Sequence, residues 1–328
     1  MKAIVTGGAG FIGSHLVDFL IKENINVTVI DNFSSGRIEN LNHIKKKIEL
    51  IESDISINKD WNKYFKNVDW VFHLAALADI VPSIQEPDSY FRANVDGTFN
   101  VLQSSKKYEV KRFIYIASSS CYGIPDKYPT PETAQIKPNY PYALTKRLGE
   151  ELVMHWSNVY CLPALSLRFF NVFGPRSRTS GTYGAVFGVF LGQKLAKKPY
   201  TVVGDGEQTR DFTFVSDIVT AIISAVKSDQ IGKIYNVGSG TTVSINHLVE
   251  LLGGEKIYIP KRPGEPDSTF ADITKIRSEI GWEPKVSFEE GVREILKYID
   301  YWADAPVWTP ESIADATKDW FKFLGENK

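Results

Sequence analysis

The amino-acid sequence predicts an α/β fold, a doubly wound parallel sheet joined to a smaller C-terminal lobe. Segments with the character of strands alternate with segments of helical periodicity through the first half of the chain. The strand-like segments are almost continuously apolar, as expected for a sheet that helices cover on both faces. After about residue 170 the alternation loosens, and we place the start of the second lobe there.

The expected strands before residue 170 are Lys2–Thr6, Asn26–Asp31, Ile48–Ser53, Trp70–Leu74, Arg112–Ala117 and Ala164–Phe169. The longest helical patterns between them cover Ser89–Lys107 and Tyr142–Trp156. Residues 1–170 therefore form the first domain, and residues 171–328 form the second lobe. Within 212–238, a helix at Asp217–Val226 and a strand at Ile234–Val237 are expected to return to the main sheet. An extra helical tail begins at about residue 300, and its aromatic residues, which are Trp302, Trp308, Trp320 and Phe321, suggest a docked helix. The site and a subunit interface are the two places that this helix could cover.

A glycine-rich turn follows the first strand. Gly7, Gly10 and Gly13 have the spacing Gly-x-x-Gly-x-x-Gly, and a helical pattern begins at Phe11 and Ile12. In a Rossmann-type site, such glycines allow a tight turn, close approach of a pyrophosphate and close packing of helix on strand. The helix N-terminus adds unpaired N–H groups and a partial positive charge. Glycines also occur in ordinary strand-to-helix turns, so this motif alone is a weak sign of a dinucleotide site.

The next strand strengthens that interpretation. It ends in Asp31, 18 positions after Gly13. An acid there accepts hydrogen bonds from the adenosine ribose hydroxyls and repels a 2′-phosphate. The nearest arginine is Arg37, with Asn32 and Phe33 directly after the acid. The pattern favours NAD over NADP as the cofactor.

Composition limits the classes of partner. The chain has 328 residues, of which 43% are hydrophobic and 23% charged, with a net charge of −1. These values argue against a nucleic-acid-binding protein and against a membrane-surface protein. No apolar stretch approaches twenty residues, and the first strand begins at the second residue, so we expect no signal peptide. Cys121 and Cys161 resemble neither a disulfide framework nor a metal cluster. We expect a cytoplasmic protein without a metal.

A tyrosine and a lysine with helical spacing could move a proton. Tyr142 and Lys146 are four residues apart and so share one face of a helix. With 15 tyrosines, about one such pair should occur by chance. The alternative is therefore a half-buried tyrosine beside a solvated lysine. The context favours a site: Pro141 suits the first helical turn, Gly149 leaves room on the same face for a cofactor, and Ser118 follows a strand together with Ser119 and Ser120.

Ionising this tyrosine at neutral pH requires a nearby positive charge that stabilises the phenolate. The phenolate costs roughly 4 kcal/mol at pH 7. A cation about 4 Å away returns roughly 4 kcal/mol at an effective dielectric constant near 20. Lys146 is one such cation, and an oxidised nicotinamide ring is a second. Tyr142 is thus the expected general base, Lys146 its partner, and Ser118 the expected proton relay.

The chain resembles the extended short-chain dehydrogenases/reductases, in the branch of NAD-dependent nucleotide-sugar epimerases and dehydratases. The resemblance runs from Met1 to about Tyr298. Its further motifs are Asp54-Ile55, His73–Ala76, Asn94–Thr98, Arg168–Pro175, Gly204–Gly206, Arg210–Phe212, Arg262–Glu265 and Ala271-Asp272. His73 is expected to be structural, because it ends a buried strand.

The resemblance implies roles for many residues. Asp54 and Ile55 would meet the adenine. The other cofactor contacts would be Asn32, Ser35, Gly36, Leu74, Ala75, Ala76, Asn94 and Phe169, besides the glycine turn, Asp31, Tyr142 and Lys146. A nucleotide-sugar diphosphate would bind Asn171, Arg210 and Arg262, with its base beside Val186 and Thr201 and its sugar beside Ser118, Ser119 and Ser120. Two arginines from separate segments suit a diphosphate, although each alone could form a surface ion pair.

The residues after Ser118 distinguish the branches of this family. Dehydratases of the family carry an acid/base pair there, and decarboxylases keep the glutamate. Here Ser119 and Ser120 take those places, and neither is a strong acid or base. The resemblance therefore implies a 4-epimerase of a UDP-hexose or UDP-N-acetylhexosamine. It would oxidise the sugar transiently to a 4-keto sugar and reduce it again from the opposite face. Thr269 stands where a large aromatic restricts some members to unsubstituted hexoses, so a 2-acetamido group should fit; an ordinary strand threonine is the alternative.

Two other functions stay open. A nucleotide-sugar 4-dehydrogenase or ketoreductase would use the same Ser/Tyr/Lys chemistry but give net redox change. The cofactor-side lysine of some 4-epimerases is replaced by Ala78-Asp79-Ile80, and weaker cofactor retention would favour that alternative. A non-catalytic regulator that senses dinucleotides generally lacks the Tyr/Lys pair. By analogy with the family, the helices near Ser89–Lys107 and Tyr142–Trp156 predict a homodimer.

Overall fold

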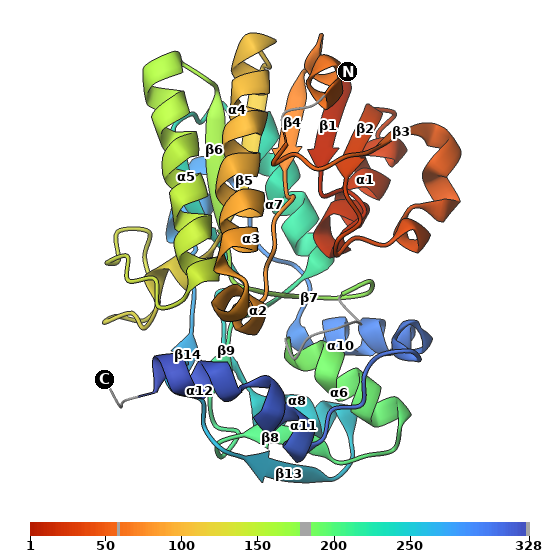
Figure 1. Ribbon diagram of the computed structural model, residues 1–328, viewed down its shortest axis with the longest axis vertical. Coiled ribbons are helices and arrows are strands. Elements are labelled where there is room, and N and C mark those ends of the chain that lie inside the picture. Colours follow the sequence, from red (N-terminus) through yellow and green to blue (C-terminus); the bar gives the residue numbers. More distant parts are fainter. Residues whose placement is uncertain (58–59, 178–184, 326–328) are drawn as a thin grey trace.

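The computed structural model describes residues 1–57, 60–177 and 185–325, and its centre is a seven-stranded parallel sheet (Figure 1). The strand order is β11-β6-β5-β4-β1-β2-β3. From β1 the chain first adds β2 and β3 on one side and then adds β4 and the later strands on the other side. The strands are β1 (Lys2–Thr6), β2 (Asn26–Asp31), β3 (Ile48–Glu52), β4 (Trp70–His73), β5 (Arg112–Ser118), β6 (Ala164–Phe169) and β11 (Lys233–Val237). All neighbouring pairs are parallel, which confirms the predicted fold class.

Helices cover both faces of the sheet. On one face α1 (Phe11–Lys22) packs against α7 (Val215–Lys227), and on the other α4 (Gly97–Lys107) packs against α5 (Pro141–Tyr160). In β1, Ala3 and Val5 belong to the core under α1, while Ile4 belongs to the core under α5. Successive side chains of a strand point to opposite faces. A strand with both faces buried must therefore be apolar throughout, as the sequence indicates.

The helical pattern at 89–107 is continuous but irregular. It consists of α3 (Pro87–Phe91), a π-helical turn at Arg92–Asp96 and α4. The π turn carries Asn94, whose side-chain amide bonds the backbone N–H and the carbonyl of Leu77, at 2.8 and 3.0 Å. This turn holds the loop after β4, where α2 (Ile80–Gln85) begins.

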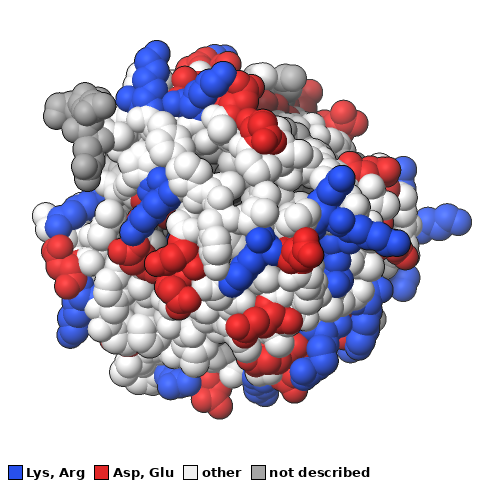
Figure 2. All heavy atoms as spheres, turned by 90° about the horizontal axis from the view of Figure 1, so that it is seen from below, with Lys and Arg blue, Asp and Glu red and all other residues white. Residues whose placement is uncertain are grey.

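The second lobe lies beyond the carboxyl ends of the strands (Figure 1). Its short strands form the pairs β7 (Asn171–Phe173) with β10 (Phe212–Phe214) and β8 (Tyr200–Val203) with β13 (Lys256–Ile259), and a sheet of β12 (Val243–Ser244), β9 (Thr209–Arg210) and β14 (Ser268–Thr269). Its helices are α6 (Val186–Leu195), α8 (Ile245–Leu252) and α10 (Phe288–Leu296). Stacked aromatic rings, such as Phe173 on Phe187 at 4.7 Å, fill its core. On the face seen from below, basic and acidic side chains are interspersed (Figure 2).

The segments after the lobe return to both parts of the molecule. Helix α9 (Thr274–Ile280) packs against β11, the edge strand of the main sheet. The tail then forms a short turn at Ile299–Trp302, α11 (Pro310–Ala316) and α12 (Lys318–Leu324). Within the described ranges, we find no helix with the length and apolar character needed to cross a membrane.

A buried ion pair fixes α5 to the sheet. The guanidinium of Arg168, on β6, lies 2.6 Å from the carboxylate of Glu150, on α5, and both side chains are at most 2% exposed. Ser166 donates to the same carboxylate at 2.8 Å, and Arg168 also donates to the hydroxyl of Tyr122 at 2.7 Å. Buried charges are stable only when paired and hydrogen-bonded. This network therefore fixes the position of the helix that carries Tyr142 and Lys146.

Replacing Glu150 with Gln should destabilise the fold, because Arg168 would remain charged, buried and without its counter-ion. We expect the free energy of unfolding to fall by about 3 to 5 kcal/mol in urea titrations. The double variant Glu150→Leu/Arg168→Met should lose less, since it buries no charge. Glu151→Gln, at a 55% exposed neighbour, is the control. A loss at Glu150 no larger than the loss at Glu151 would contradict this account.

Candidate active site

A cavity of about 360 Å³ opens at the carboxyl ends of β1, β2 and β4, beside the glycine turn. Such crevices are where doubly wound sheets bind ligands. The predicted cofactor residues that line it are Gly7, Gly10, Phe11, Ile12, Gly13, Asp31, Asn32, Ser35, Gly36, Asp54, Ile55, Leu74, Ala75 and Ala76. Segments from four separate parts of the sequence therefore meet at one cavity.

The shape of the glycine turn suits a dinucleotide. Gly7 has φ +71°, and a Cβ there would lie 2.6 Å from the backbone nitrogen of Ala75. A Cβ at Gly13 would lie 2.2 Å from the carbonyl oxygen of Gly7. No side chain caps the N-terminus of α1, which begins directly after Gly10. The turn thus brings bare backbone and a helix N-terminus to the cavity, as a pyrophosphate requires.

Asp31 lines this cavity and also holds the glycine turn. Its carboxylate accepts hydrogen bonds from the backbone N–H groups of Ala9 and Phe33, both at 2.9 Å. Burial raises the pKa of Asp31, and these two hydrogen bonds lower it. A Cβ at Gly36 would lie 2.8 Å from the same carboxylate, so a larger residue there would displace the acid.

The other predicted cofactor residues lie outside this cavity. Asn94 is 1% exposed and bonded to Leu77, so it acts through the loop after β4. Phe169 and Tyr142 line a second, adjacent cavity instead, which is described below. Lys146 is buried beneath the site, as described below.

At the end of β5, the hydroxyls of three residues meet. Ser120 donates to the Oγ of Ser118 at 2.9 Å, and the hydroxyl of Tyr142 lies close enough to Ser118 for that serine to act on its pKa. Burial has the larger effect and raises the pKa of Tyr142, whereas Ser118 lowers it. Tyr140 stacks on Tyr142 with ring centroids 6.4 Å apart and planes 9° apart. A proton can therefore move between Tyr142 and a substrate hydroxyl at Ser118.

Lys146 is buried, and its side chain is directed towards β5. Its ammonium donates to the carbonyl oxygen of Ile116 and lies 4.5 Å above the ring of Tyr115. Burial lowers the pKa of Lys146 to about 7, although Glu150 raises it. The ammonium is therefore held against β5, and its stabilisation of the Tyr142 phenolate stays a prediction.

Gly149 serves a different purpose from the one expected. A Cβ at this position would lie 2.3 Å from the hydroxyl of Tyr115, which donates to the carbonyl of Lys146 at 3.2 Å. Gly149 therefore makes room for Tyr115 and not for a cofactor. His73 is structural, as expected: its ring nitrogens lie 2.7 Å from the hydroxyl of Thr6 and 2.9 Å from that of Thr98.

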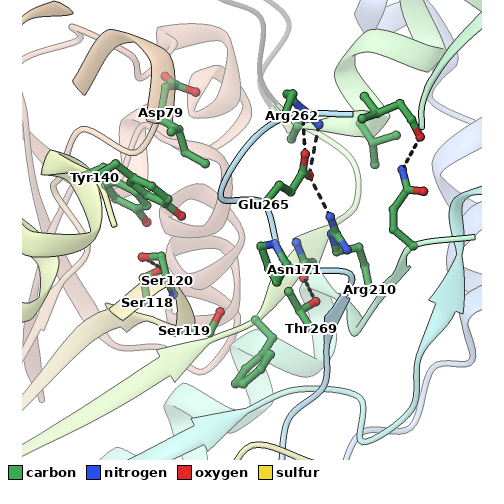
Figure 3. A pocket seen from close by; sticks show the side chains of 18 of the residues that line it. Asp79, Ser118, Ser119, Ser120, Tyr140, Asn171, Arg210, Arg262, Glu265 and Thr269 are labelled. Carbon is green, nitrogen blue, oxygen red and sulfur yellow. Dashed lines mark hydrogen bonds and ion pairs between the residues drawn. The ribbon is translucent and has the colours of Figure 1, made fainter. Parts of the chain in front are cut away.

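A second cavity, also of about 360 Å³, extends from the serines to the second lobe (Figure 3). The predicted substrate residues that line it are Ser118, Ser119, Ser120, Asn171, Val186, Thr201, Arg210, Arg262 and Thr269. Thr269 donates to the side-chain oxygen of Asn171 at 2.6 Å. The structure thus brings every predicted substrate residue to one cavity.

The two arginines share one carboxylate. Arg210 donates to Glu265 at 2.8 Å, and Arg262 donates to it at 2.7 Å. The arginines lower the pKa of Glu265, against the effect of its burial. In Figure 3 this cluster lies across the cavity from Tyr140 and the serines. The cavity therefore has a proton-transfer end and an anion-binding end.

Several lining residues were not assigned by the sequence analysis, among them Glu265, Tyr140 and Trp320. Glu265 was part of a motif without a role, although an acid three residues after an arginine is a recognisable ion-pair spacing. Tyr140 precedes the helix of Tyr142 and has no signature of its own. Trp320 comes from α12, in the tail for which the sequence analysis left the site and a subunit interface as alternatives, and no local pattern distinguishes the two.

Comparisons with known proteins agree with this architecture. A family model described as GDP-mannose 4,6 dehydratase matches residues 4–295. The solved UDP-glucose 4-epimerase of Thermotoga maritima, with UDP-glucose, is 36% identical with TM-score 0.87, over 92% of this chain and 99% of that one. The UDP-N-acetylglucosamine 4-epimerase of Methanobrevibacter ruminantium M1 is 37% identical with TM-score 0.87, over 92% and 98%. UDP-glucuronic acid decarboxylase 1 of Arabidopsis thaliana is 35% identical, over 90% of this chain and 69% of that protein.

Lys146→Met should alter the pH dependence of stability. The folded pKa of Lys146 is about 7, against 10.5 for an ordinary lysine, so between these values the unfolded chain binds a proton that the folded protein does not. The stability of the unliganded wild type should then rise relative to the variant as the pH increases from 7 to 10.5. Urea unfolding at several pH values measures this, with exposed Lys66→Met as the control. A difference that stays constant with pH would refute it.

Proposed function

The chain belongs to the family of NAD-dependent nucleotide-sugar epimerases and dehydratases, and we propose that within it the chain is a 4-epimerase of UDP-hexoses or UDP-N-acetylhexosamines. The observation that carries this proposal is the end of β5. There Ser118 meets Tyr142, and serines follow where elimination would need an acid/base pair.

The first cavity supports NAD as the cofactor. The bare glycine turn suits a pyrophosphate, and Asp31 suits two free ribose hydroxyls. A 2′-phosphate would meet the carboxylate of Asp31, which favours NAD over NADP. Bound NAD would accept and return the hydride, which is the chemistry that the side chains of the site lack.

The proposed proton chemistry uses Tyr142 and Ser118. Tyr142 takes the proton of the sugar 4-hydroxyl, directly or through Ser118, as C4 is oxidised to a ketone. Arg210 and Arg262 hold the diphosphate, so the 4-keto sugar can turn about its bond to that anchor. Tyr142 then returns the proton to the 4-oxygen as C4 is reduced on the opposite face. The product differs from the substrate only in the configuration at C4.

The acids of the substrate cavity argue against elimination and decarboxylation. Among its described lining residues the acidic ones are Asp79 and Glu265. Glu265 is paired with two arginines, and neither acid follows Ser118 in the chain. Because the positions after Ser118 carry only hydroxyls, the site offers hydride and proton transfer at one carbon.

One observation favours a second candidate, a nucleotide-sugar 4-dehydrogenase or ketoreductase. Asp79 lines both cavities, at the place where some 4-epimerases have a cofactor-side lysine. Without that lysine the grip on the pyrophosphate would be weaker, so the cofactor would exchange more readily. Net oxidation or reduction requires such exchange.

We also propose a homodimer formed through α4 and α5. Large apolar side chains are exposed along α3, α4 and α5, namely Phe91, Phe99, Leu144, Val159 and Tyr160. Exposed apolar surface on adjacent helices is typical of a subunit interface. A monomeric mass in light scattering would remove this proposal.

The proposed reaction is tested with a panel of UDP-, GDP-, CDP- and dTDP-sugars. We expect conversion of a UDP-sugar to its C4 epimer, seen by anomeric NMR, with no change of mass and no stoichiometric NADH. Tyr142→Phe should lower kcat by about 10²–10⁴-fold while nucleotide binding persists. Loss of water would indicate a dehydratase, and NADH equal to substrate consumed would indicate a dehydrogenase. Full turnover by Tyr142→Phe would overturn the proposed chemistry.

Thr269→Tyr tests the proposed tolerance of a 2-acetamido group. Thr269 lines the substrate cavity, so a tyrosine would fill space beside the sugar. Turnover of UDP-N-acetylglucosamine should fall at least tenfold more than turnover of UDP-glucose, about 1.4 kcal/mol of selectivity. Thr269→Ser, which keeps the hydroxyl bonded to Asn171, is the control. Equal loss on both substrates would refute this role.

A further inference from the structure

The C-terminal tail reaches the substrate cavity from outside the region that the family model matches. That region ends at residue 295, whereas α11 and α12 cover 310–316 and 318–324. Trp320, on α12, lines the same cavity as Ser118 and Arg210. The tail therefore brings to the site an aromatic side chain that the matched region does not contain.

The tail is firmly docked. Trp302, at its start, is fully buried in the second lobe. The side-chain amide of Gln193 donates to the carbonyl of Trp308 and to the hydroxyl of Thr201, each at 2.8 Å. On the other side of the cavity, Gln85 of α2 donates to Asp319 at 3.0 Å, and α12 packs against α2 (Figure 1). The tail thus contacts both sides of the cavity.

Trp320 lies between the two ends of the cavity. Its indole N–H donates to the carbonyl of Pro263 at 2.7 Å, and the guanidinium of Arg262 lies 5.1 Å from its ring centre. Its ring centroid is 6.5 Å from that of Tyr140, which itself stacks on Tyr142. Trp320 is 3% exposed, so it is a packed wall and not a surface residue. It therefore connects the anion-binding end to the proton-transfer end.

We propose that Trp320 bounds the sugar compartment of the substrate cavity and orients Arg262, so that α12 is part of the substrate-binding site. This inference rests on the proposed function. A nucleotide sugar held by Arg262 at its diphosphate and by Tyr142 at C4 must place its sugar ring between them. That is where Tyr140, Trp320 and Arg262 form one continuous row (Figure 3 shows Tyr140 and Arg262). A cation on an indole face is attracted by the ring as well as packed against it.

Removing the indole should therefore weaken substrate binding more than catalysis. For Trp320→Ala we expect KM for the UDP-sugar to rise at least tenfold and kcat to change less than threefold. Trp320→Phe keeps a ring between Tyr140 and Arg262 but loses the bond to Pro263, so its KM should be intermediate. The matched control is Phe321→Ala, which removes a neighbouring aromatic of the same helix that is 40% exposed. Its KM should equal that of the wild type.

The outcomes separate this inference from the proposed function. NAD affinity should be equal in all four proteins, because Trp320 does not line the cofactor cavity, and equality shows that the variants are folded. If the wild type turns over no nucleotide sugar, the proposed function fails. The inference is then judged on UDP binding by calorimetry, where Trp320→Ala must still lose affinity relative to Phe321→Ala. Equal KM and equal UDP affinity for Trp320→Ala and Phe321→Ala would overturn it.

Discussion

The site depends on the buried ion pair between Arg168 of β6 and Glu150 of α5. Glu150 lies one helical turn after Lys146 and two turns after Tyr142, so fixing its carboxylate fixes the rotation of α5 about its axis. A small rotation would move Tyr142 away from Ser118, whose position is set by β5 at the adjacent place in the sheet. Tyr115 and Gly149 limit how closely α5 and β5 approach, and Asn94 bonds Thr145 on the same helix at 3.0 Å.

Much of this architecture could be predicted because its signals are local. Strands buried on both faces have to be apolar throughout, and their ends fell within a residue or so of the predicted positions. The glycine turn and Asp31 are recognisable because a pyrophosphate needs bare backbone and a ribose needs an acceptor. Spacing alone did not prove that Tyr142 and Lys146 belong to a site. The position of Tyr142 beside Ser118 at one cavity, although the two are 24 positions apart, supports that interpretation.

The remaining features come from contacts between distant segments, which a linear pattern does not record. In the sequence, Gly149 is equally compatible with space for a cofactor and with space for a neighbouring ring. Only the packing of α5 on β5 identifies Tyr115 as its neighbour. The ammonium of Lys146 bonds Ile116 across thirty positions, so its direction in the unliganded protein could not be inferred from helical spacing. Trp320 reaches the cavity through the docking of a tail whose aromatic residues indicate a docked helix but do not say whether it covers the site or a subunit interface.

Arg210 and Arg262 share the carboxylate of Glu265. Without it, the two guanidinium groups would repel one another, and their side chains would adopt other rotamers. Glu265 acts as a resident counter-ion, so both groups are preorganised by folding itself. A diphosphate that binds as proposed would compete with this carboxylate for the same two guanidinium groups. A dianion would then be favoured over a monoanion, which gains little over the carboxylate already present.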